Sequence, residues 1–548
     1  MKNVEKYKKF ETIRLSDRTW PDKESTKAPI WCSVDLRDGN QALINPMNLE
    51  QKVKFFKKLV EIGFKEIEVG FPSASQIEFD FLRKLIEDNL VPEDVTLQVL
   101  TQAREHLIRR TFEALKGLPR AILHIYNSTS ILQRDVVFGK SKEEIKQIAI
   151  DGVNLVSELS KEFDGEIILE YSPESFTGTE MDYAAEVCNA VVDAWGGSKD
   201  KKVIINLPST VEMDTPNVYA DQIEYMCRSF KNRDAVIVSL HPHNDRGCGV
   251  AACELGLMAG ADRVEGTLFG NGERTGNLDI VNVGLNMYVK GVDPKLDFSD
   301  INSLKDLYED VTGMTIPDRQ PYAGKLVFTA FSGSHQDAIN KGMRAYKDRQ
   351  NKYWEGPYLP IDPDDLGRKY EPLVRINSQS GRGGIAFVLE QTYGLRVPKS
   401  MQGDFVNVVK RATEVKGEMT PKELFELFMN TYLDVCDECE FVRQFIDDSG
   451  NERKRYLTIN YKGQEETYFG DGEGPIESVI SALNASKHYN IDIVDYSQHS
   501  LNDGSKSDAI TYLEIKDIPS GKTAFGVGID SSVVRSTINA IFSAINRL

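Results

Sequence analysis

The stretch AVIVSLHPHNDRG (235–247) joins a short apolar run to a polar end that carries two histidines one residue apart. Successive residues of the run are apolar, so both of its faces can be buried, as in a parallel sheet. Side chains two residues apart on a strand point to the same side. We therefore expect a buried strand here, with His241 and His243 projecting together from its carboxyl end.

Seven similar runs occur within the first 275 residues, separated by segments in which apolar residues return every three or four positions. That spacing is typical of amphipathic helices. Eight alternating strand and helix units predict a (β/α)8 TIM barrel, and an open, doubly wound sheet is the alternative. The seven further strand candidates are IWCSVDL from Ile30, EIEVGF from Glu66, TLQVLT from Thr96, AILHIYN from Ala121, EIILEYS from Glu166, KVIINLP from Lys202 and RVEGTLFG from Arg263.

Polar residues follow four other strands of this set at the point where each one ends, in DLRDGNQ, YSPES, LPSTVEM and LFGNGERTGN. The carboxyl ends of the strands build the active site of a TIM barrel. One pocket should therefore combine imidazole, carboxylate, hydroxyl and guanidinium groups. The residues expected to converge on this rim are Arg37, Asp38, Ser172, Glu174, Thr210, His241, His243 and Asn271.

The two histidines, with a carboxylate and an amide oxygen nearby, form a donor set that suits a divalent cation. Ligation by His241, His243, Asp38 and Asn271 would leave positions open for the carboxylate and keto oxygens of a 2-oxo acid. Mixed nitrogen and oxygen ligands do not choose among zinc, manganese and magnesium. Arg37 could stabilise an oxyanion beside the cation, or it could form a structural salt bridge.

The composition narrows the expected partners and location. The chain has 548 residues, and its 84 acidic and 66 basic residues give a net charge of −18. This balance argues against nucleic acid or an anionic membrane as the main partner. No apolar run reaches the roughly 18 residues of a membrane span, and the N-terminal residues lack the apolar core of a signal peptide. We expect a cytoplasmic protein.

We expect four regions along the chain: an N-terminal extension (1–29), the catalytic barrel (30–317), a linker with subdomains (318–435) and a regulatory domain (436–548). The last region carries two similar segments, FGDGEGPIESVISAL and FGVGIDSSVVRSTINAI. Each has FGxG before an amphipathic helix that carries Ser-Val, and the second is two residues shorter between FGxG and Ser-Val. These segments predict an α+β domain built from a duplicated unit.

Taken together, the motifs resemble the long form of the 2-isopropylmalate synthase family, among the acyl-CoA-condensing, lyase-like metallobarrels. The resemblance rests on DLRDGNQAL, ILEYSPESFTGTE, NLPSTVEM, HPHNDRG, LFGNGERTGN, TAFSGSHQDAINKG and NSQSGRGG, in this order. It runs from about Pro29 to Gly384 and continues more loosely to the C-terminus. It implies that acetyl-CoA adds to 3-methyl-2-oxobutanoate and that thioester hydrolysis releases 2-isopropylmalate and CoA, the committed step of leucine biosynthesis.

The resemblance also implies roles for individual residues. The metal ligands would be Asp38, His241, His243 and Asn271, the keto acid would contact Arg37, Ser172, Glu174 and Thr210, and the catalytic set would be Arg37, Glu174, His335 and Tyr358. His335 would deprotonate acetyl-CoA, with Tyr358 beside it. In the family these two residues come from the partner chain of a homodimer that exchanges subdomains, so a homodimer is expected.

The long form of the family carries an allosteric domain that binds L-leucine, which implies feedback inhibition. Its matching segments here contain Gly472, Gly474, Pro475, Tyr496 and Asp530. Turn glycines without a ligand are the alternative. Three other functions stay open on the sequence: a citramalate or homocitrate synthase, a barrel metallohydrolase, and a non-catalytic amino-acid sensor.

Overall fold

The computed structural model describes residues 3–10, 13, 15–330, 332–349, 352–370, 376–377, 380–447, 454–501 and 507–548. The chain forms two compact units. One comprises Met1–Phe328 with Pro360–Lys369, and the other comprises Thr329–Leu359 with Tyr370–Leu548. Among the described residues, the helices are all too short or too polar to cross a membrane.

The first unit contains a closed barrel of eight parallel strands, in which β1 pairs with β2 on one side and with β8 on the other. The closure confirms the predicted TIM barrel and rules out the open sheet. All eight strands lie where the apolar runs predicted them: β1 Ile30–Ser33, β2 Glu66–Glu68, β3 Thr96–Gln102, β4 Arg120–Ser128, β5 Glu166–Glu174, β6 Val203–Ser209, β7 Val236–Pro242 and β8 Arg263–Gly266.

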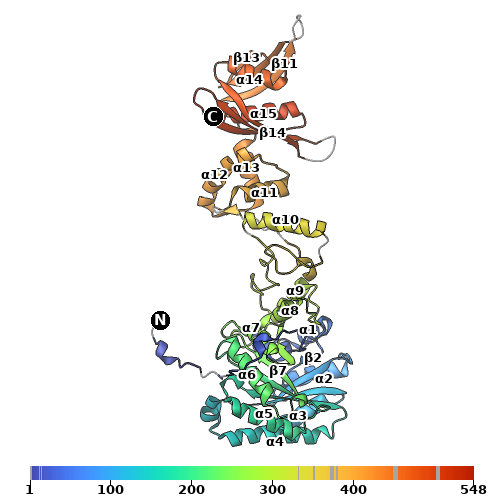
Figure 1. Ribbon diagram of the computed structural model, residues 1–548. Coiled ribbons are helices and arrows are strands. Elements are labelled where there is room, and N and C mark those ends of the chain that lie inside the picture. Colours follow the sequence, from blue (N-terminus) through green and yellow to red (C-terminus); the bar gives the residue numbers. More distant parts are fainter. Residues whose placement is uncertain are drawn as a thin grey trace. The chain divides into compact units, whose positions relative to one another are not determined.

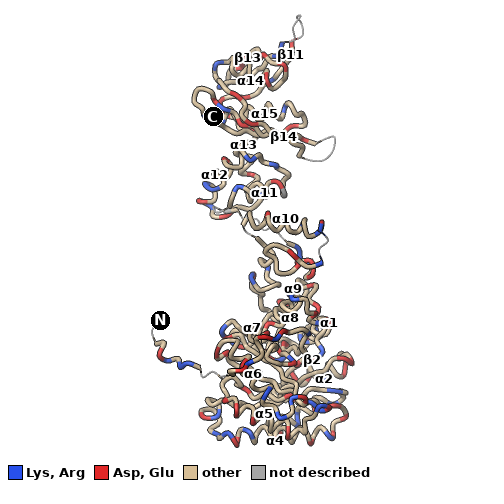
Figure 2. The backbone as a smooth tube through the Cα atoms, viewed as in Figure 1, with Lys and Arg blue, Asp and Glu red and all other residues tan. Residues whose placement is uncertain are grey.

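Helices surround the strands (Figure 1). Local sequence sets where they begin: Asn48 with Gln51 and Ser141 with Glu144 form capping boxes that satisfy the first backbone N–H groups of α1 and α4. Along α4 two Lys lie among Asp and Glu, whereas the charged residues of α5 are all acidic (Figure 2). The helices are α1 Leu49–Ile62, α2 Gln76–Glu87, α3 Glu105–Leu115, α4 Lys142–Ser160, α5 Met181–Trp195, α6 Pro216–Ser229, α7 Gly249–Met258, α8 Ile280–Tyr288 and α9 Ile301–Thr312.

The second unit begins with α10 and continues into a helical subdomain with its own apolar core. Residues between 376 and 432 build most of this core, and Ile510, Tyr512 and Val527 from the C-terminal domain complete it. The helical subdomain therefore depends on the domain that follows it. Its elements are α10 Gly333–Arg349, β9 Ile376–Asn377, α11 Arg382–Tyr393, α12 Lys399–Lys416, β10 Glu418–Met419 and α13 Pro421–Tyr432.

The C-terminal domain consists of two copies of one unit, each a three-stranded antiparallel sheet followed by a helix. The first copy contains β11 Cys439–Asp447, β12 Lys454–Tyr461, β13 Gln464–Gly470 and α14 Pro475–Ala485. The second contains β14 Ile491–Ser500, β15 Ala509–Asp517, β16 Thr523–Asp530 and α15 Val533–Ile545. The predicted duplication is therefore visible as a repeated fold.

Matching hydrogen bonds show how the two copies align. Gln444 Nε2 donates to the Pro475 carbonyl oxygen at 3.0 Å and Gln498 Nε2 to the Val533 carbonyl oxygen at 3.2 Å, so both helices begin against an equivalent glutamine. A Cβ on Gly470 would lie 1.9 Å from the Ser478 carbonyl oxygen, and one on Gly528 would lie 2.0 Å from that of Ser536.

Gly470 is thus equivalent to Gly528, and each precedes its helix serine by eight residues. This spacing corrects the expected alignment, which paired Gly472 with Gly528 and Ser478 with Ser532 and so made the second copy two residues shorter. The close approach of helix to strand, which only glycine permits here, decides the equivalence.

Candidate functional site

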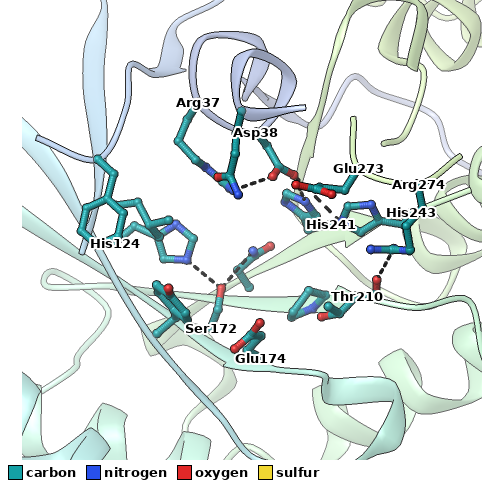
Figure 3. A pocket seen from close by; sticks show the side chains of 16 residues that line it. Arg37, Asp38, His124, Ser172, Glu174, Thr210, His241, His243, Glu273 and Arg274 are labelled. Atoms are coloured by element: carbon teal, nitrogen blue, oxygen red, sulfur yellow. Dashed lines mark hydrogen bonds and ion pairs between the residues drawn. The ribbon is translucent and has the colours of Figure 1, made fainter. Parts of the chain in front are cut away.

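A cavity of about 370 Å³ lies at the carboxyl ends of the barrel strands. Arg37 and Asp38 reach it from a single turn of π-helix, Asp35–Gly39, that directly follows β1. Seven of the eight residues predicted to converge on this rim line the cavity, and Asn271 does not. The sixteen lining residues include His124, Tyr126 and Asn206, whose side chains come from within β4 and β6. Figure 3 shows the labelled side chains around this space.

Asp38, His241 and His243 form a buried group whose ligand atoms all lie within 4.8 Å of one another. His241 Nε2 lies 3.3 Å from Asp38 Oδ2, and His243 Nε2 lies 4.0 Å from the same oxygen. Asn277 Oδ1 lies 3.1 Å from His241 Nε2. Two imidazole nitrogens and a carboxylate thus lie close together, with an amide oxygen beside His241 Nε2, and this donor set fits a divalent cation.

The amide beside this group is that of Asn277, whereas the sequence pointed to Asn271. Asn271 turns its Nδ2 to the Gly39 carbonyl oxygen at 2.9 Å. An isolated antiparallel bridge between His243 and Asn277 brings the end of the same loop back beside β7. That tertiary bridge could not be read from LFGNGERTGN, which offers two asparagines six residues apart.

Charges in the site perturb its titrating groups. Burial opposes ionisation of Asp38, but Arg37 and His241 outweigh burial and hold the pKa of this carboxyl well below its usual range. Burial also opposes protonation of His241, yet its bonds to Asp38 and Glu265 raise its pKa to about 9. Burial and the neighbouring His241 lower the pKa of His243 to about 4. Strongly perturbed groups that share a cleft are typical of a functional site.

The other predicted cavity residues are held by hydrogen bonds to neighbouring strands. Glu174 accepts a hydrogen bond from Ser128 Oγ. Ser172 Oγ lies 2.7 Å from His124 Nε2, and Thr210 Oγ1 accepts from the Ser175 backbone N–H at 3.0 Å. The site is therefore ordered on the side away from the histidine pair as well.

A buried layer of polar side chains at the floor of the cavity was not expected from the sequence. The sequence did contain an indication of this layer, because polar residues interrupt otherwise apolar strand runs, as in EIEVGF, TLQVLT, AILHIYN and RVEGTLFG. Runs that are apolar on both faces rarely tolerate such residues without partners. The members of the layer are Glu68, Gln98, His124, Glu170, Asn206, Arg263 and Glu265.

The expected base for acetyl-CoA lies in the second unit. His335 belongs to α10, and its ring stacks on Tyr358 with the centroids 4.2 Å apart and the planes at 28°. Both side chains are exposed. The structure thus brings this pair together, outside the unit that holds the barrel.

The residues expected to bind L-leucine lie on both copies of the repeated unit. Gly474 and Pro475 begin α14 and line a surface pocket, and Gly472 lies just before them. Tyr496 belongs to β14, and Asp530 ends β16, where its carboxylate accepts from the Ser532 backbone N–H at 2.8 Å. Four of these five residues therefore lie at or just before the beginnings of α14 and α15, one helix in each copy.

Three families match successive parts of the chain. The HMGL-like family matches residues 28–308, the alpha-isopropylmalate synthase post-catalytic domain-like family matches 325–390, and the LeuA allosteric (dimerisation) domain matches 418–548. The first match spans the barrel and its buried histidine pair, so the fold and the site define an HMGL-like barrel enzyme.

Full-length relatives narrow this class further. A 2-isopropylmalate synthase of Clostridium acetobutylicum is 54% identical over 99% of both chains, and one of Acetoanaerobium sticklandii is 55% identical over 100% of this chain and 97% of its own. A solved hydroxymethylglutaryl-CoA lyase from Pseudomonas aeruginosa matches 54% of this chain and 96% of its own, with 18% identity and a TM-score of 0.44. The chain belongs to the 2-isopropylmalate synthase family, whose members are acyltransferases.

Proposed function

We propose that this enzyme condenses acetyl-CoA with 3-methyl-2-oxobutanoate and hydrolyses the thioester to yield 2-isopropylmalate and CoA, the first committed step of leucine biosynthesis. The observation that carries the proposal is the group of Asp38, His241 and His243, which faces Glu174 and Thr210 across one cavity. Relatives of the same length and more than half identical in sequence support the choice of reaction.

We place the cation between Asp38, His241 and His243, with Asn277 as the amide ligand in place of Asn271. When bound, a divalent cation would supply Lewis acidity to the keto group of the substrate. The donor set suits zinc, manganese or magnesium. Asp38 is held ionised by Arg37, which lies 2.8 Å away, so this ligand is ready to bind at neutral pH.

Arg37, Ser172, Glu174 and Thr210 would orient the keto acid. Condensation moves the negative charge onto the former keto oxygen as the new carbon–carbon bond forms. A guanidinium fixed beside that oxygen stabilises the charge without reorganising. Arg37 is fixed in this way, because its Nε donates to Glu68 and its Nη1 contacts Asp38.

The methyl group of acetyl-CoA must lose a proton before it can attack. His335, stacked on Tyr358, is the base we propose, and both would come from the partner in a homodimer with exchanged subdomains. The match to the LeuA dimerisation domain supports a homodimer. Water then attacks the thioester carbonyl, the carbon–sulfur bond breaks, and CoA leaves as its thiol.

A thiol-release assay over a panel of keto acids tests the function. With acetyl-CoA present, 3-methyl-2-oxobutanoate should give a higher kcat/KM than pyruvate or 2-oxoglutarate. EDTA should stop turnover, added divalent metal should restore it, and Asp38→Ala should abolish it. A better rate with pyruvate or 2-oxoglutarate would instead identify a citramalate or homocitrate synthase.

Mixing variants tests the exchange between chains. Asp38→Ala and His335→Ala should each be inactive alone, because each lacks one half of every site. Co-expressed, they would form heterodimers in which one site has both halves intact, so activity should return. A mixture that stays inactive, although heterodimers form, would contradict the exchange.

We further propose that L-leucine inhibits the enzyme through the repeated C-terminal units. Removing this domain is a poor test, because Ile510, Tyr512 and Val527 complete the core of the helical subdomain. Asp530→Asn should weaken inhibition by leucine without changing kcat. Asp517→Asn is the matched control, because Asp517 also accepts from a backbone N–H just beyond the end of its strand, that of Ser520 at 3.0 Å. Equal inhibition of both variants and the wild type would place the effector elsewhere.

A further inference from the structure

At the floor of the cavity, polar side chains from six strands form a connected layer across the barrel interior. Each of them is at most 3% exposed, and hydrogen bonds and ion pairs join them to one another. Buried polar groups of this kind are costly unless they are satisfied, and a satisfied network fixes one arrangement. The layer joins side chains that line opposite sides of the cavity.

On one side, Glu265 sets the tautomer of His241. Glu265 Oε2 lies 2.8 Å from His241 Nδ1, and Arg263 Nη1 donates to Glu265 Oε1 at 2.8 Å. A carboxylate only accepts hydrogen bonds, so Nδ1 carries the proton. Nε2 is therefore the nitrogen that would lose its proton to bind a cation, and it is this atom that faces Asp38 and Asn277.

On the other side, Glu68 holds His124 and Arg37 together. Glu68 Oε2 lies 2.9 Å from His124 Nδ1, which leaves His124 Nε2 to accept from the Ser172 hydroxyl at 2.7 Å. Glu68 Oε1 accepts from Arg37 Nε. One buried carboxylate thus orients two side chains that line the cavity on the side of the keto acid.

Gln98 joins the two carboxylates. Its single amide nitrogen donates to Glu68 Oε2 at 2.8 Å and to Glu265 Oε1 at 2.9 Å. Asn206 makes a second, longer link, because its Nδ2 donates to Ser172 Oγ and to Glu265 Oε2, both at 3.1 Å. The amide of Gln98 has two hydrogens and uses both, so its position determines the separation of the two glutamates.

We propose that Gln98 is a positioning residue that, through Glu68 and Glu265, holds the cation-binding side of the cavity and the keto-acid side at a fixed separation. The inference rests on the proposed function. It adds the groups that align the cation-binding side of the cavity with the keto-acid side. Partners that orient a metal-binding histidine typically change metal affinity 10- to 100-fold when they are replaced. A residue that only fills space would not couple metal affinity to substrate binding.

Gln98→Leu removes both donors at similar volume. In the substrate-free protein, we expect its affinity for Co²⁺, followed by the absorption of the bound ion, to fall about 10-fold or more. We also expect the KM for 3-methyl-2-oxobutanoate to rise in the same variant. Glu66→Gln is the matched control: it removes a carboxylate that accepts from Arg263 Nε at 2.6 Å but contacts neither histidine nor Gln98, so both quantities should change much less than in Gln98→Leu.

Two conservative variants test the cation-binding side and the keto-acid side of the cavity separately. They keep the test valid if Gln98→Leu does not fold. Glu265→Gln should weaken Co²⁺ binding about 10- to 100-fold, while Glu68→Gln should weaken Co²⁺ binding much less and raise the KM. Equal effects of the two variants on Co²⁺ binding would overturn the inference. A folded Gln98→Leu with wild-type affinity and KM would overturn it as well. Absence of Co²⁺ binding by the wild type would overturn the proposed cation site first, and this inference with it.

Discussion

The choice between Asn277 and Asn271 as the amide ligand can be tested by replacing each with alanine. The two residues lie six positions apart on one loop, and only Asn277 places its amide oxygen beside His241 Nε2, at 3.1 Å. We therefore expect Asn277→Ala to weaken the binding of a divalent cation and Asn271→Ala to leave it almost unchanged. The pair is well matched, since each side chain donates to a backbone carbonyl oxygen, Asn271 to that of Gly39 at 2.9 Å and Asn277 to that of Asn271 at 3.2 Å.

The magnitudes follow from what each side chain contacts. Replacing a group that orients a metal ligand costs about 10- to 100-fold in affinity, or ~1.4–2.7 kcal/mol, and loss of a ligand itself should cost at least as much. Asn271→Ala loses one hydrogen bond to the Gly39 carbonyl oxygen, so it should cost about 0.5–1.5 kcal/mol in stability. Asn277→Ala should thus be recognised by its loss of metal affinity, and Asn271→Ala by a loss of stability alone.

Competition with a chromophoric chelator measures the affinity on protein stripped of metal by EDTA. Thermal unfolding of the same samples reports stability. The reasoning would be refuted if Asn271→Ala lost affinity while Asn277→Ala bound the cation like the wild type. It would then be the loop around Asn271, and not the bridge beside β7, that supplies the amide.

Two further predictions concern stability. Burial opposes ionisation of Glu180, but Arg134 outweighs it and lowers the pKa to about 2, so this pair stabilises the fold above the unfolded value of 4.5 and loses its effect as the pH falls toward 2. Glu180→Gln should therefore be less stable at pH 7 and show a shallower loss of stability between pH 4.5 and 2, measured by urea unfolding. Gly528→Ala should destabilise the C-terminal domain by about 1–3 kcal/mol, because the new methyl group would clash with the Ser536 carbonyl oxygen. A methyl group added at Gly474 would meet nothing within 4 Å, so the Gly474→Ala protein should unfold at the wild-type temperature.

Much of the fold could be read from the sequence, because the signals for it are local. Apolar runs of strand length, separated by helical periodicity, marked all eight strands of the barrel within a few residues. The pairing of His241 with His243 also followed locally, since the period of a strand fixes the direction of alternate side chains. The repeat in the C-terminal domain was visible for a similar reason, through its glycines and helix starts.

The residues that complete the site were decided by contacts between distant segments. Asn277 reaches the histidines only because its loop returns to β7, and the sequence alone favoured Asn271. Glu68, Gln98 and Glu265 come from three strands and meet only inside the closed barrel. The equivalence of Gly470 and Gly528 likewise depended on how closely each helix lies on its strand. Sequence periodicity determines which way a side chain points from its own strand, whereas barrel closure and loop return determine which other side chains it meets.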